Sequence, residues 1–232
     1  MEARVTIALK LSVVVPVLNE SRALPALLEH LQPLRRSGVE VVLVDGGSDD
    51  GSAAIVACAG FQVICAERGR ARQMNAGAAA VHGDVLLFLH ADTRLPDGAV
   101  QLIDAALADG RHVWGRFDVE FDVRTWTMAA TAFGMNLRSR LSGIATGDQA
   151  LFMTRAAFDG VGGFPDQPLM EDVEITARLR QRSRPACVRR PVLTSARRWQ
   201  ARGAWRTIFL MWRLRLDYWL GASPADLARR YR

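Results

Sequence analysis

The sequence predicts an α/β protein with a mainly parallel central sheet flanked by helices. Two observations on the first half of the chain carry this prediction. Short apolar runs alternate there with helical patterns, as in proteins whose parallel strands are joined by helices. The runs are apolar at successive positions, which is typical of strands buried on both faces. The four runs cover residues 11–17, 39–45, 61–66 and 84–92.

The remaining elements are justified by their own patterns. Helical patterns cover about residues 21–36, 51–59, 69–81 and 97–108. In the second half, the alternation at 113–123 indicates an antiparallel strand, 125–141 indicates a helix, and 146–158 indicates a strand that runs into a short helix. A Gly/Pro loop within 160–182 leads to a helix with an acidic first turn. No linker or repeat interrupts the chain, so we expect one domain at 1–200 (halves 11–110 and 111–200) and a helical extension at 201–232.

Composition and charge limit the classes of function. Half of the residues are hydrophobic and 23% are charged, which excludes a disordered chain. The formal net charge is +6 and Lys10 is the only lysine, so almost all the positive charge comes from arginine. The planar guanidinium group of arginine is suited to binding phosphates or carboxylates. Three cysteines without a C-x-x-C pair argue against a disulfide framework and for a reducing cytoplasm. No apolar run approaches the roughly 18 residues of a membrane span, and the apolar N-terminal stretch indicates a first strand rather than a signal peptide.

Polar residues gather where the predicted strands end, which is where open α/β sheets bind ligands. The segment "DGGSDDGS" (45–52) follows the second strand. It fits an ordinary capped turn, or a nucleotide pocket in which Asp45 accepts a hydrogen bond from a base or ribose. "HADT" (90–93) follows the fourth strand, and extended backbone there would place His90 and Asp92 on one face. Asp92 fits either a turn cap or a ligand of a hard divalent cation.

Two helix starts carry unusual charge. Arg68, Arg70 and Arg72 open the helix at 69–81, where they oppose the helix dipole, so the pattern favours an anion site. Glu171 and Asp172 lie in the first turn of a later helix. Acidic first turns are common for dipole reasons alone, and a general base is the functional alternative.

Taken in order, these segments resemble the family 2 inverting glycosyltransferases of the GT-A fold. "VVLVDGGSDDGS" is similar to the family's V-V-D-D-G-S segment, "GRARQMNAGA" to its Arg-Asn-x-Gly segment and "LLFLHADT" to its D-x-D strand end. "GGFPDQPLMED" resembles the acceptor loop that leads to a Glu-Asp catalytic motif. The likeness covers about residues 11–182, and the VDGGS, RQMNAGA and LHADT spellings resemble a small bacterial subgroup.

The resemblance implies a donor, a metal and a catalytic base. The donor would be a nucleotide-diphosphate sugar of the UDP or GDP type, and the acceptor is unidentified. Asp92 would bind Mn²⁺ or Mg²⁺, and Asp172, preceded by Glu171, would deprotonate the acceptor hydroxyl. Gly163 would belong to the acceptor loop. The implied donor-binding residues are Pro16, Asn19, Glu20, Asp45, Arg68, Arg72, Asn75, His90 and Ala91. An element similar to the family's Arg-Trp segment, which closes over donor or acceptor, comprises Arg197, Arg198 and Trp199.

Two positions depart from the family pattern. Gly46 stands where many members have a second aspartate that reads the base, which leaves the nucleotide open. His90 replaces the first aspartate of D-x-D. It can hydrogen-bond a ribose hydroxyl or ligate a softer metal. The substitution also leaves open the alternative that the protein binds a nucleotide without catalysing transfer.

The C-terminal segment 204–221 has an aromatic stripe at helical spacing, formed by Trp205, Ile208, Phe209, Trp212, Leu216 and Trp219. Packing of this stripe on the catalytic domain is the usual explanation. The alternative is peripheral binding to a membrane, which tryptophans beside arginines favour. We therefore expect a cytoplasmic protein, with the inner face of the cell membrane as its possible location.

Two further classes of function fit less well. A nucleotidyltransferase on a similar sheet needs a Gly-rich loop with a catalytic lysine or arginine directly after the first strand, and "PVLNESRAL" lacks it. A basic nucleic-acid-binding module is suggested only by the pI, its basic residues are not interleaved with aromatics, and it leaves Asp92 and Asp172 unexplained. We therefore expect no nucleic-acid partner.

Overall fold

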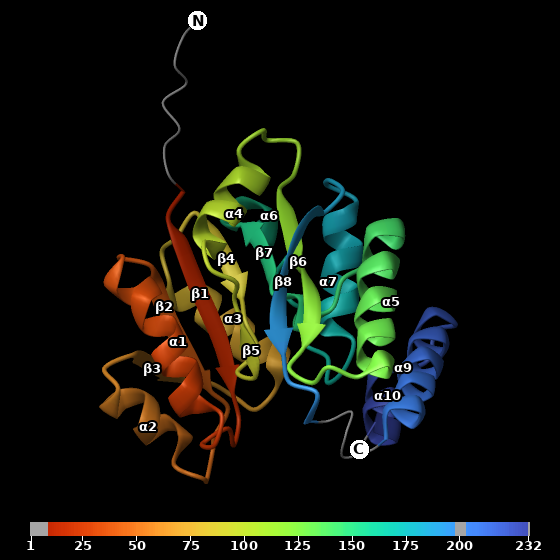
Figure 1. Cartoon of the computed structure of the whole chain (residues 1–232), viewed down its shortest axis with the longest axis horizontal. Helices are drawn as coiled ribbons and strands as arrows, with labels where there is room; N and C mark the ends of the chain where they lie inside the picture. Colours follow the sequence, from red (N-terminus) through yellow and green to blue (C-terminus); the bar gives the residue numbers. More distant parts are fainter. Residues whose placement is uncertain (1–8, 198–202, 232) are drawn as a thin grey trace, which may run out of the picture.

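The computed structural model describes residues 9–197 and 203–231 (Figure 1). One mixed sheet has the strand order β3-β2-β1-β4-β7-β6-β8-β5. Its strands are β1 (Leu11–Val17), β2 (Glu40–Asp45), β3 (Gln62–Cys65), β4 (Val85–Phe88), β5 (Thr93–Arg94), β6 (Trp114–Phe121), β7 (Leu151–Thr154) and β8 (Ala186–Thr194). The helices are α1 (Leu24–Arg36), α2 (Ser52–Cys58), α3 (Arg70–Ala80), α4 (Ala99–Leu107), α5 (Trp126–Ser142), η1 (Gly147–Gln149), α6 (Arg155–Gly160), α7 (Glu171–Arg180), α9 (Ala204–Trp219) and α10 (Pro224–Tyr231).

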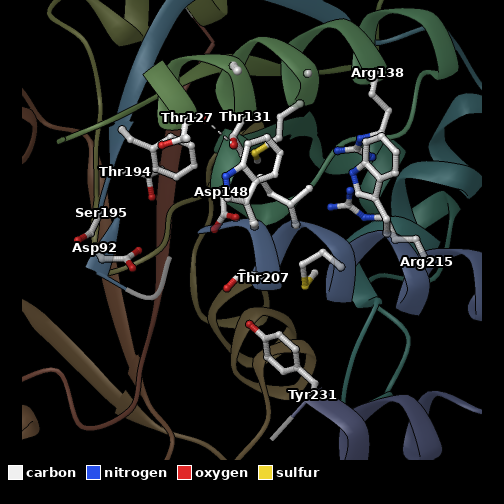
Figure 2. A pocket seen from close by; sticks show the side chains of 18 residues that line it. Asp92, Thr127, Thr131, Arg138, Asp148, Thr194, Ser195, Thr207, Arg215 and Tyr231 are labelled. Atoms are coloured by element: carbon white, nitrogen blue, oxygen red, sulfur yellow. Dashed lines mark hydrogen bonds between the residues drawn. The ribbon is translucent and has the colours of Figure 1, made fainter. Parts of the chain in front are cut away.

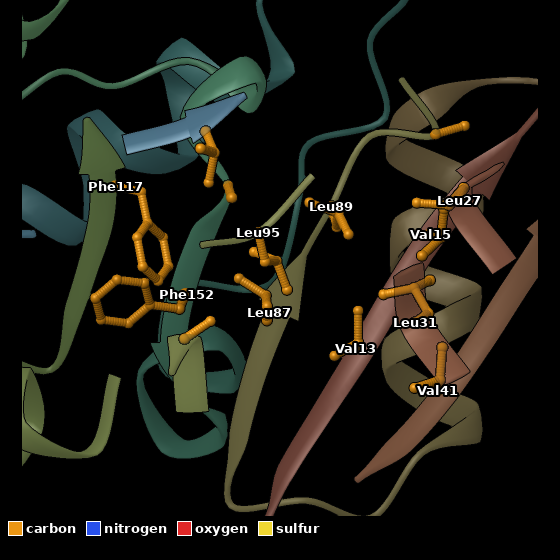
Figure 3. Close-up of a cluster of buried hydrophobic side chains, with 14 of the residues drawn as sticks. Val13, Val15, Leu27, Leu31, Val41, Leu87, Leu89, Leu95, Phe117 and Phe152 are labelled. Carbon is orange, nitrogen blue, oxygen red and sulfur yellow. The ribbon is translucent and has the colours of Figure 1, made fainter. Parts of the chain in front are cut away.

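The first half of the sheet is parallel, which confirms the predicted fold class. Strands β3, β2, β1 and β4 pair in parallel, with Val15 in register with Leu43. Alternate residues of β1 enter different cores: Val13 and Val15 pack under α1 and α4, whereas Val14 packs under α3. Figure 3 shows the first of these cores, where Val13 and Val15 lie beside the α1 leucines. Helices on both faces explain why the strands are apolar at successive positions.

The second half of the sheet is mixed. β7 runs antiparallel to β4 and β6, β8 runs parallel to β6, and the short β5 closes the far edge. The sequence patterns assigned neither β5 nor β8. β8 was not predicted because Arg189, Arg190 and Pro191 interrupt its apolar pattern. In the structure its register with β6 shifts at Phe117/Asp118. A bulge of this kind lets a strand carry exposed residues inside the ladder.

The predicted strand at 84–92 is too long. β4 ends at Phe88, and the Thr93 N–H donates to the His90 carbonyl at 3.1 Å, which forms a turn. The chain then reverses into β5, which pairs with β8. His90 and Asp92 therefore do not lie on one extended segment, and the expectation that they share a strand face is wrong.

The C-terminal helices pack beside α5 and α7 (Figure 1). α9 buries Leu214 and α10 buries Leu227 against Leu169, Met170 and Val173. The aromatic stripe is mostly exposed rather than buried on the catalytic domain as expected, although Trp205 contacts Trp126 of α5. Five stripe residues are exposed: Trp205, Phe209, Trp212, Leu216 and Trp219. Within the described ranges, no helix has both the length and the apolar character needed to cross a bilayer.

Candidate active site

Asp45 ends β2 with one carboxylate oxygen held and the other without a partner. Oδ2 accepts hydrogen bonds from the backbone N–H groups of Gly47 and Ser48, each at 3.0 Å. Oδ1 is buried and accepts no hydrogen bond from the residues that the structure describes. A buried carboxylate oxygen without a donor is costly, so Oδ1 has the capacity to accept a further hydrogen bond, and contact of Asp45 with a nucleotide stays a prediction.

Asn19 and Glu20 join the loops that follow β1 and β2. Asn19 has φ +53°; its backbone N–H donates to Ser48 Oγ at 2.9 Å, and its Oδ1 accepts from the Asp49 N–H at 3.1 Å. The Glu20 N–H donates to Ser52 Oγ, and its carboxylate pairs with Arg197 at 3.2 Å. Both side chains shape the rim of the site beside Asp45. Pro16 lies within β1, in register with Val44.

Gln73 fills the space that a side chain at Gly46 would need. Its Nε2 donates to the carbonyls of Val17 and Val44 at 2.7 and 2.8 Å. A Cβ built on Gly46 would lie 2.9 Å from Gln73 Cδ. The second aspartate of many family members therefore has no room here while Gln73 bridges β1 and β2. The sequence patterns missed Gln73, whose position depends on how α3 packs on the sheet.

Three of the predicted donor-binding residues lie before or within α3. Arg68 is exposed. Arg72 is also exposed and pairs with Asp166 at 2.8 Å and with Glu67 at 2.5 Å. The Asn75 amide donates to the Phe164 carbonyl and accepts from the Phe164 N–H, at 2.8 and 2.9 Å. Arg72 and Asn75 thus hold the segment around Gly163, where φ is +68°, and contact with the donor stays a prediction for both.

His90, Ala91 and Asp92 form the turn after β4. His90 Nδ1 lies 3.2 Å from Asp148 Oδ1, and its ring packs against Gly147. Ala91 is buried. Asp92 lines the larger cavity shown in Figure 2 and also a second cavity, with which it shares Thr194 and Ser195. Its backbone carbonyl accepts from the Ser195 N–H at 3.1 Å. The turn therefore directs His90 toward Asp148 and places Asp92 at the cavities.

Asp172 lies at the start of α7, tied to the loop before β7. Its Oδ2 accepts from the Gly147 N–H at 2.9 Å, and its Oδ1 accepts from the Val173 N–H at 2.7 Å. Met170 precedes the helix in the left-handed region, with φ +67°. Such backbone is unfavourable for a residue with a Cβ and is held in place by its surroundings, often at functional sites. Burial, followed by the Asp172 charge, raises the pKa of the neighbouring Glu171.

Arginines face this acidic cluster. A small cavity of about 70 Å³ is lined by Arg70, Asp148, Glu171, Asp172 and Arg215, among others. Burial acts to lower the pKa of Arg70, but the carboxylates of Glu171, Asp148 and Asp172 reverse this and raise it. Asp148 and Arg215 had no sequence signal, because they come from η1 and α9, which only the fold brings together.

A larger cavity of about 420 Å³ lies between α5 and α9 and reaches Asp92 (Figure 2). It shares Asp148, Met211, Arg215 and Tyr231 with the small cavity that contains Asp172. Asp92 and Asp172 therefore line two neighbouring cavities that share these four residues. Arg198 and Trp199, which the resemblance places near this region, lie outside the described residues.

The described residues offer no group of three or more His, Cys, Asp and Glu side chains that could hold a metal alone. Asp92 supplies one hard oxygen ligand, and its side chain has no hydrogen bond within residues 9–197 and 203–231. Mg²⁺ and Mn²⁺ suit carboxylate, phosphate and water oxygens, and Mg²⁺ in particular is held by one or two carboxylates plus substrate phosphates. Asp92 fits a cation of this kind that arrives with a diphosphate.

The chain is similar to several curated transferases. Undecaprenyl-phosphate 4-deoxy-4-formamido-L-arabinose transferase of Serratia proteamaculans is 32% identical over 117 residues, which cover 46% of this chain and 36% of the relative. The protein of the same name from Sodalis glossinidius is 30% identical over 157 residues, which cover 60% and 46%. The chain thus spans less than half the length of these relatives.

Solved structures show the same fold. The mannosyltransferase PcManGT from Pyrobaculum calidifontis, in complex with GDP-Man and Mn²⁺, has a TM-score of 0.61 and 20% identity, covering 82% of this chain and 57% of that one. S. aureus TarS 1–349 with UDP-GlcNAc has a TM-score of 0.65 and 20% identity, covering 80% and 58%.

The family model of glycosyl transferase family 2 matches residues 12–164, which include the Asp45 turn, α3 and the Asp92 turn. The chain belongs to glycosyl transferase family 2 and is a glycosyltransferase of the GT-A fold.

Proposed function

We propose that the protein is a metal-dependent inverting glycosyltransferase that moves a sugar from a nucleotide diphosphate to an acceptor hydroxyl. The observation that supports this most directly is that Asp92 and Asp172 line two neighbouring cavities with four lining residues in common. The Asp92 carboxylate lines the larger cavity and could bind a cation there, and the Asp172 carboxylate is oriented by two backbone N–H groups. The two carboxylates would therefore serve different steps, one on the donor side and one on the acceptor side.

The reaction is a single displacement. The acceptor hydroxyl oxygen attacks the anomeric carbon and its proton passes to the Asp172 carboxylate. The bond from the anomeric carbon to the diphosphate oxygen breaks, and its electron pair leaves with the nucleoside diphosphate. Asp92 would hold a divalent cation, which would neutralise the charge that develops on that leaving group. Attack from the face opposite the leaving group inverts the anomeric configuration.

The nucleotide is proposed to bind beside Asp45. Two solved neighbours contain GDP-Man and UDP-GlcNAc, which supports a donor of the GDP or UDP type. The unpartnered Asp45 Oδ1 suits an N–H or O–H donor on the base or ribose. A screen of nucleotide-sugar hydrolysis tests this proposal and identifies the donor; hydrolysis of no UDP or GDP sugar would reject it.

We also propose that α9 contacts an anionic membrane surface. The exposed stripe on α9 continues on α5, where Trp126, Phe133, Leu137 and Leu141 are exposed, and Trp126 lies 5.7 Å from Trp205 between ring centroids. Segments 124–142 and 203–231 contain eight arginines and two aspartates, so they carry a charge equal to the whole formal net charge of +6. Apolar rings beside arginines match an anionic bilayer.

Flotation with vesicles tests the membrane contact. Vesicles of phosphatidylcholine with phosphatidylglycerol should carry the protein, and vesicles of phosphatidylcholine alone should carry less. Phe209→Ser combined with Trp212→Ser should abolish flotation, whereas Leu193→Ser, which removes an exposed leucine from β8, should not. Equal flotation of all three proteins would reject the contact.

A further inference from the structure

Two arginines of like charge are held together in the wall of the larger cavity. Arg138 comes from α5 and Arg215 from α9, and both line the cavity (Figure 2). Arg138 Nη2 and Arg215 Nε are buried and donate to no acceptor in the part of the chain that the structure describes. Within that part, neither guanidinium forms an ion pair with a carboxylate. Arg138 makes one long hydrogen bond, to the Ile144 carbonyl at 3.4 Å.

This arrangement is unfavourable without an anion. Burial, followed by the charge of Arg215, lowers the pKa of Arg138 to about 10. Burial also lowers the pKa of Arg215, although Asp172 and Asp148 act in the opposite direction. Buried guanidinium groups without a partner are costly, whereas two of them converging on one phosphate form several charge-assisted hydrogen bonds. The pair therefore has the chemistry of a phosphate site.

The position of the pair separates it from the donor diphosphate. Figure 2 shows Asp92 at one end of the view and Arg138 with Arg215 at the other, with Asp148 between them. Both arginines interact electrostatically with Asp172, the proposed base. A phosphate bound there lies on the acceptor side of the site.

The rest of the cavity wall suits an apolar chain. It includes Ala130, Met135, Trp205, Ile208, Met211 and Trp212. Trp205 and Trp212 also belong to the exposed stripe of α9, so the apolar wall continues to the surface proposed to meet a membrane. A cationic pair at one end and an apolar path to the surface match a molecule with a phosphate head and an apolar tail.

We infer that the acceptor is a phosphate ester of an apolar chain, with its phosphate bound between Arg138 and Arg215 and its chain along the apolar wall between α5 and α9. This inference rests on the proposed function for the direction of transfer. The phosphate ester can be a polyprenyl phosphate, which attacks through a P–OH oxygen, or a glycerophospholipid, which attacks through a headgroup hydroxyl. In both cases the proton of the attacking group passes to Asp172, and the two share the head chemistry that the arginines recognise.

Calorimetry on the full chain tests the inference. The probes are farnesyl phosphate, dioctanoyl phosphatidylglycerol, farnesol and inorganic phosphate, each below the concentration at which it aggregates. Wild type should bind at least one of the two phosphate esters at least tenfold more tightly than farnesol and inorganic phosphate, and the tighter ester identifies the source. Arg138→Gln and Arg215→Gln should each weaken that binding about tenfold, as expected for one lost charge-assisted contact. Arg213→Gln, which removes an exposed arginine of α9, should stay within about twofold.

Two readouts separate this inference from misfolding and from failure of the proposed function. Each glutamine variant removes one of two unpaired buried charges, so its unfolding temperature should equal or exceed that of wild type. Addition of the phosphate ester should raise the unfolding temperature of wild type only. Binding of UDP or GDP with Mn²⁺ should be the same in all variants, because Asp45 and Asp92 are untouched. Equal affinity for farnesol, equal affinity for inorganic phosphate, or unchanged ester binding by both glutamine variants would overturn the inference.

Discussion

The Asp172 carboxylate accepts a hydrogen bond from the backbone N–H of Gly147 at 2.9 Å. This contact joins the first turn of α7 to the loop that carries Asp148, and the Val173 N–H holds the other carboxylate oxygen at 2.7 Å. The carboxylate is therefore oriented before any acceptor arrives, as a positioned base requires.

Asp172→Asn should retain nucleotide binding and lose turnover. The amide keeps the shape of the side chain but cannot take the acceptor proton, and a general base typically contributes about 10²–10⁴-fold to the rate. Initial rates of nucleoside diphosphate release, measured beside calorimetry of nucleotide binding, give both quantities. Glu174→Gln is the matched control, because Glu174 lies on the same helix and bonds Arg178 and Tyr218 instead. Turnover at the wild-type rate would reject Asp172 as the base.

Asp45→Asn should weaken nucleotide binding about 10- to 100-fold, the effect of losing one hydrogen bond to a charged acceptor. The asparagine oxygen can still accept from Gly47 and Ser48, but the amide nitrogen would then occupy the place of Oδ1 and accept nothing. Titration with the nucleoside diphosphate of the donor measures the change. Asp49→Asn alters an exposed neighbour and should bind as wild type does; equal losses in the two variants would indicate general electrostatics rather than a contact at Asp45.

Gly46→Ala should lower the free energy of unfolding by about 1–3 kcal/mol by displacing Gln73 from the carbonyls that it bridges. The new Cβ would lie 2.9 Å from Gln73 Cδ. In a Gln73→Ala background the same change should be nearly neutral, because the bridge is already lost. Urea unfolding of the four proteins gives the coupling energy. Additive effects would show that the two side chains do not compete for this space.

Glu171→Gln should stabilise the protein near neutral pH and have little effect at low pH. Burial and the Asp172 charge raise the pKa of folded Glu171 above its ordinary value of 4.5. Between the unfolded and folded pKa values the folded state binds more protons, so the free energy of unfolding falls as pH rises through that window. The penalty is complete above the folded pKa, and glutamine removes it. Denaturant unfolding below pH 4.5 and at pH 7 compares the two proteins; a difference that does not grow with pH would contradict this sign.

The sequence was sufficient for the parallel half of the sheet and for the residues at its strand ends. Successive apolar positions in β1 and β2 indicated strands buried on both faces, and Asp45 lies where β2 ends. Asp92 lies in the turn after β4 rather than at the strand end itself. β8 was not predicted, because exposed arginines interrupt its apolar pattern next to a bulge in its pairing with β6.

The acceptor side depended on tertiary structure. Asp148, Arg138 and Arg215 come from η1, α5 and α9, and no local spacing relates them. Periodicity located the aromatic stripe of α9, but it cannot tell which face of an amphipathic helix meets the protein. Here Leu214 provides the buried contact, and the tryptophans are exposed.

The role proposed for Asp92 is tested most directly by calorimetry of UDP and GDP with and without Mn²⁺, on wild type and on Asp92→Asn. If Asp92 binds the donor through a metal, at least one nucleoside diphosphate should bind wild type more tightly with Mn²⁺ than without it. The Mn²⁺ enhancement should disappear in Asp92→Asn, while metal-free binding through Asp45 persists. Nucleotide binding that Mn²⁺ does not change, or an enhancement that survives in Asp92→Asn, would contradict the central claim that Asp92 binds the donor through a metal.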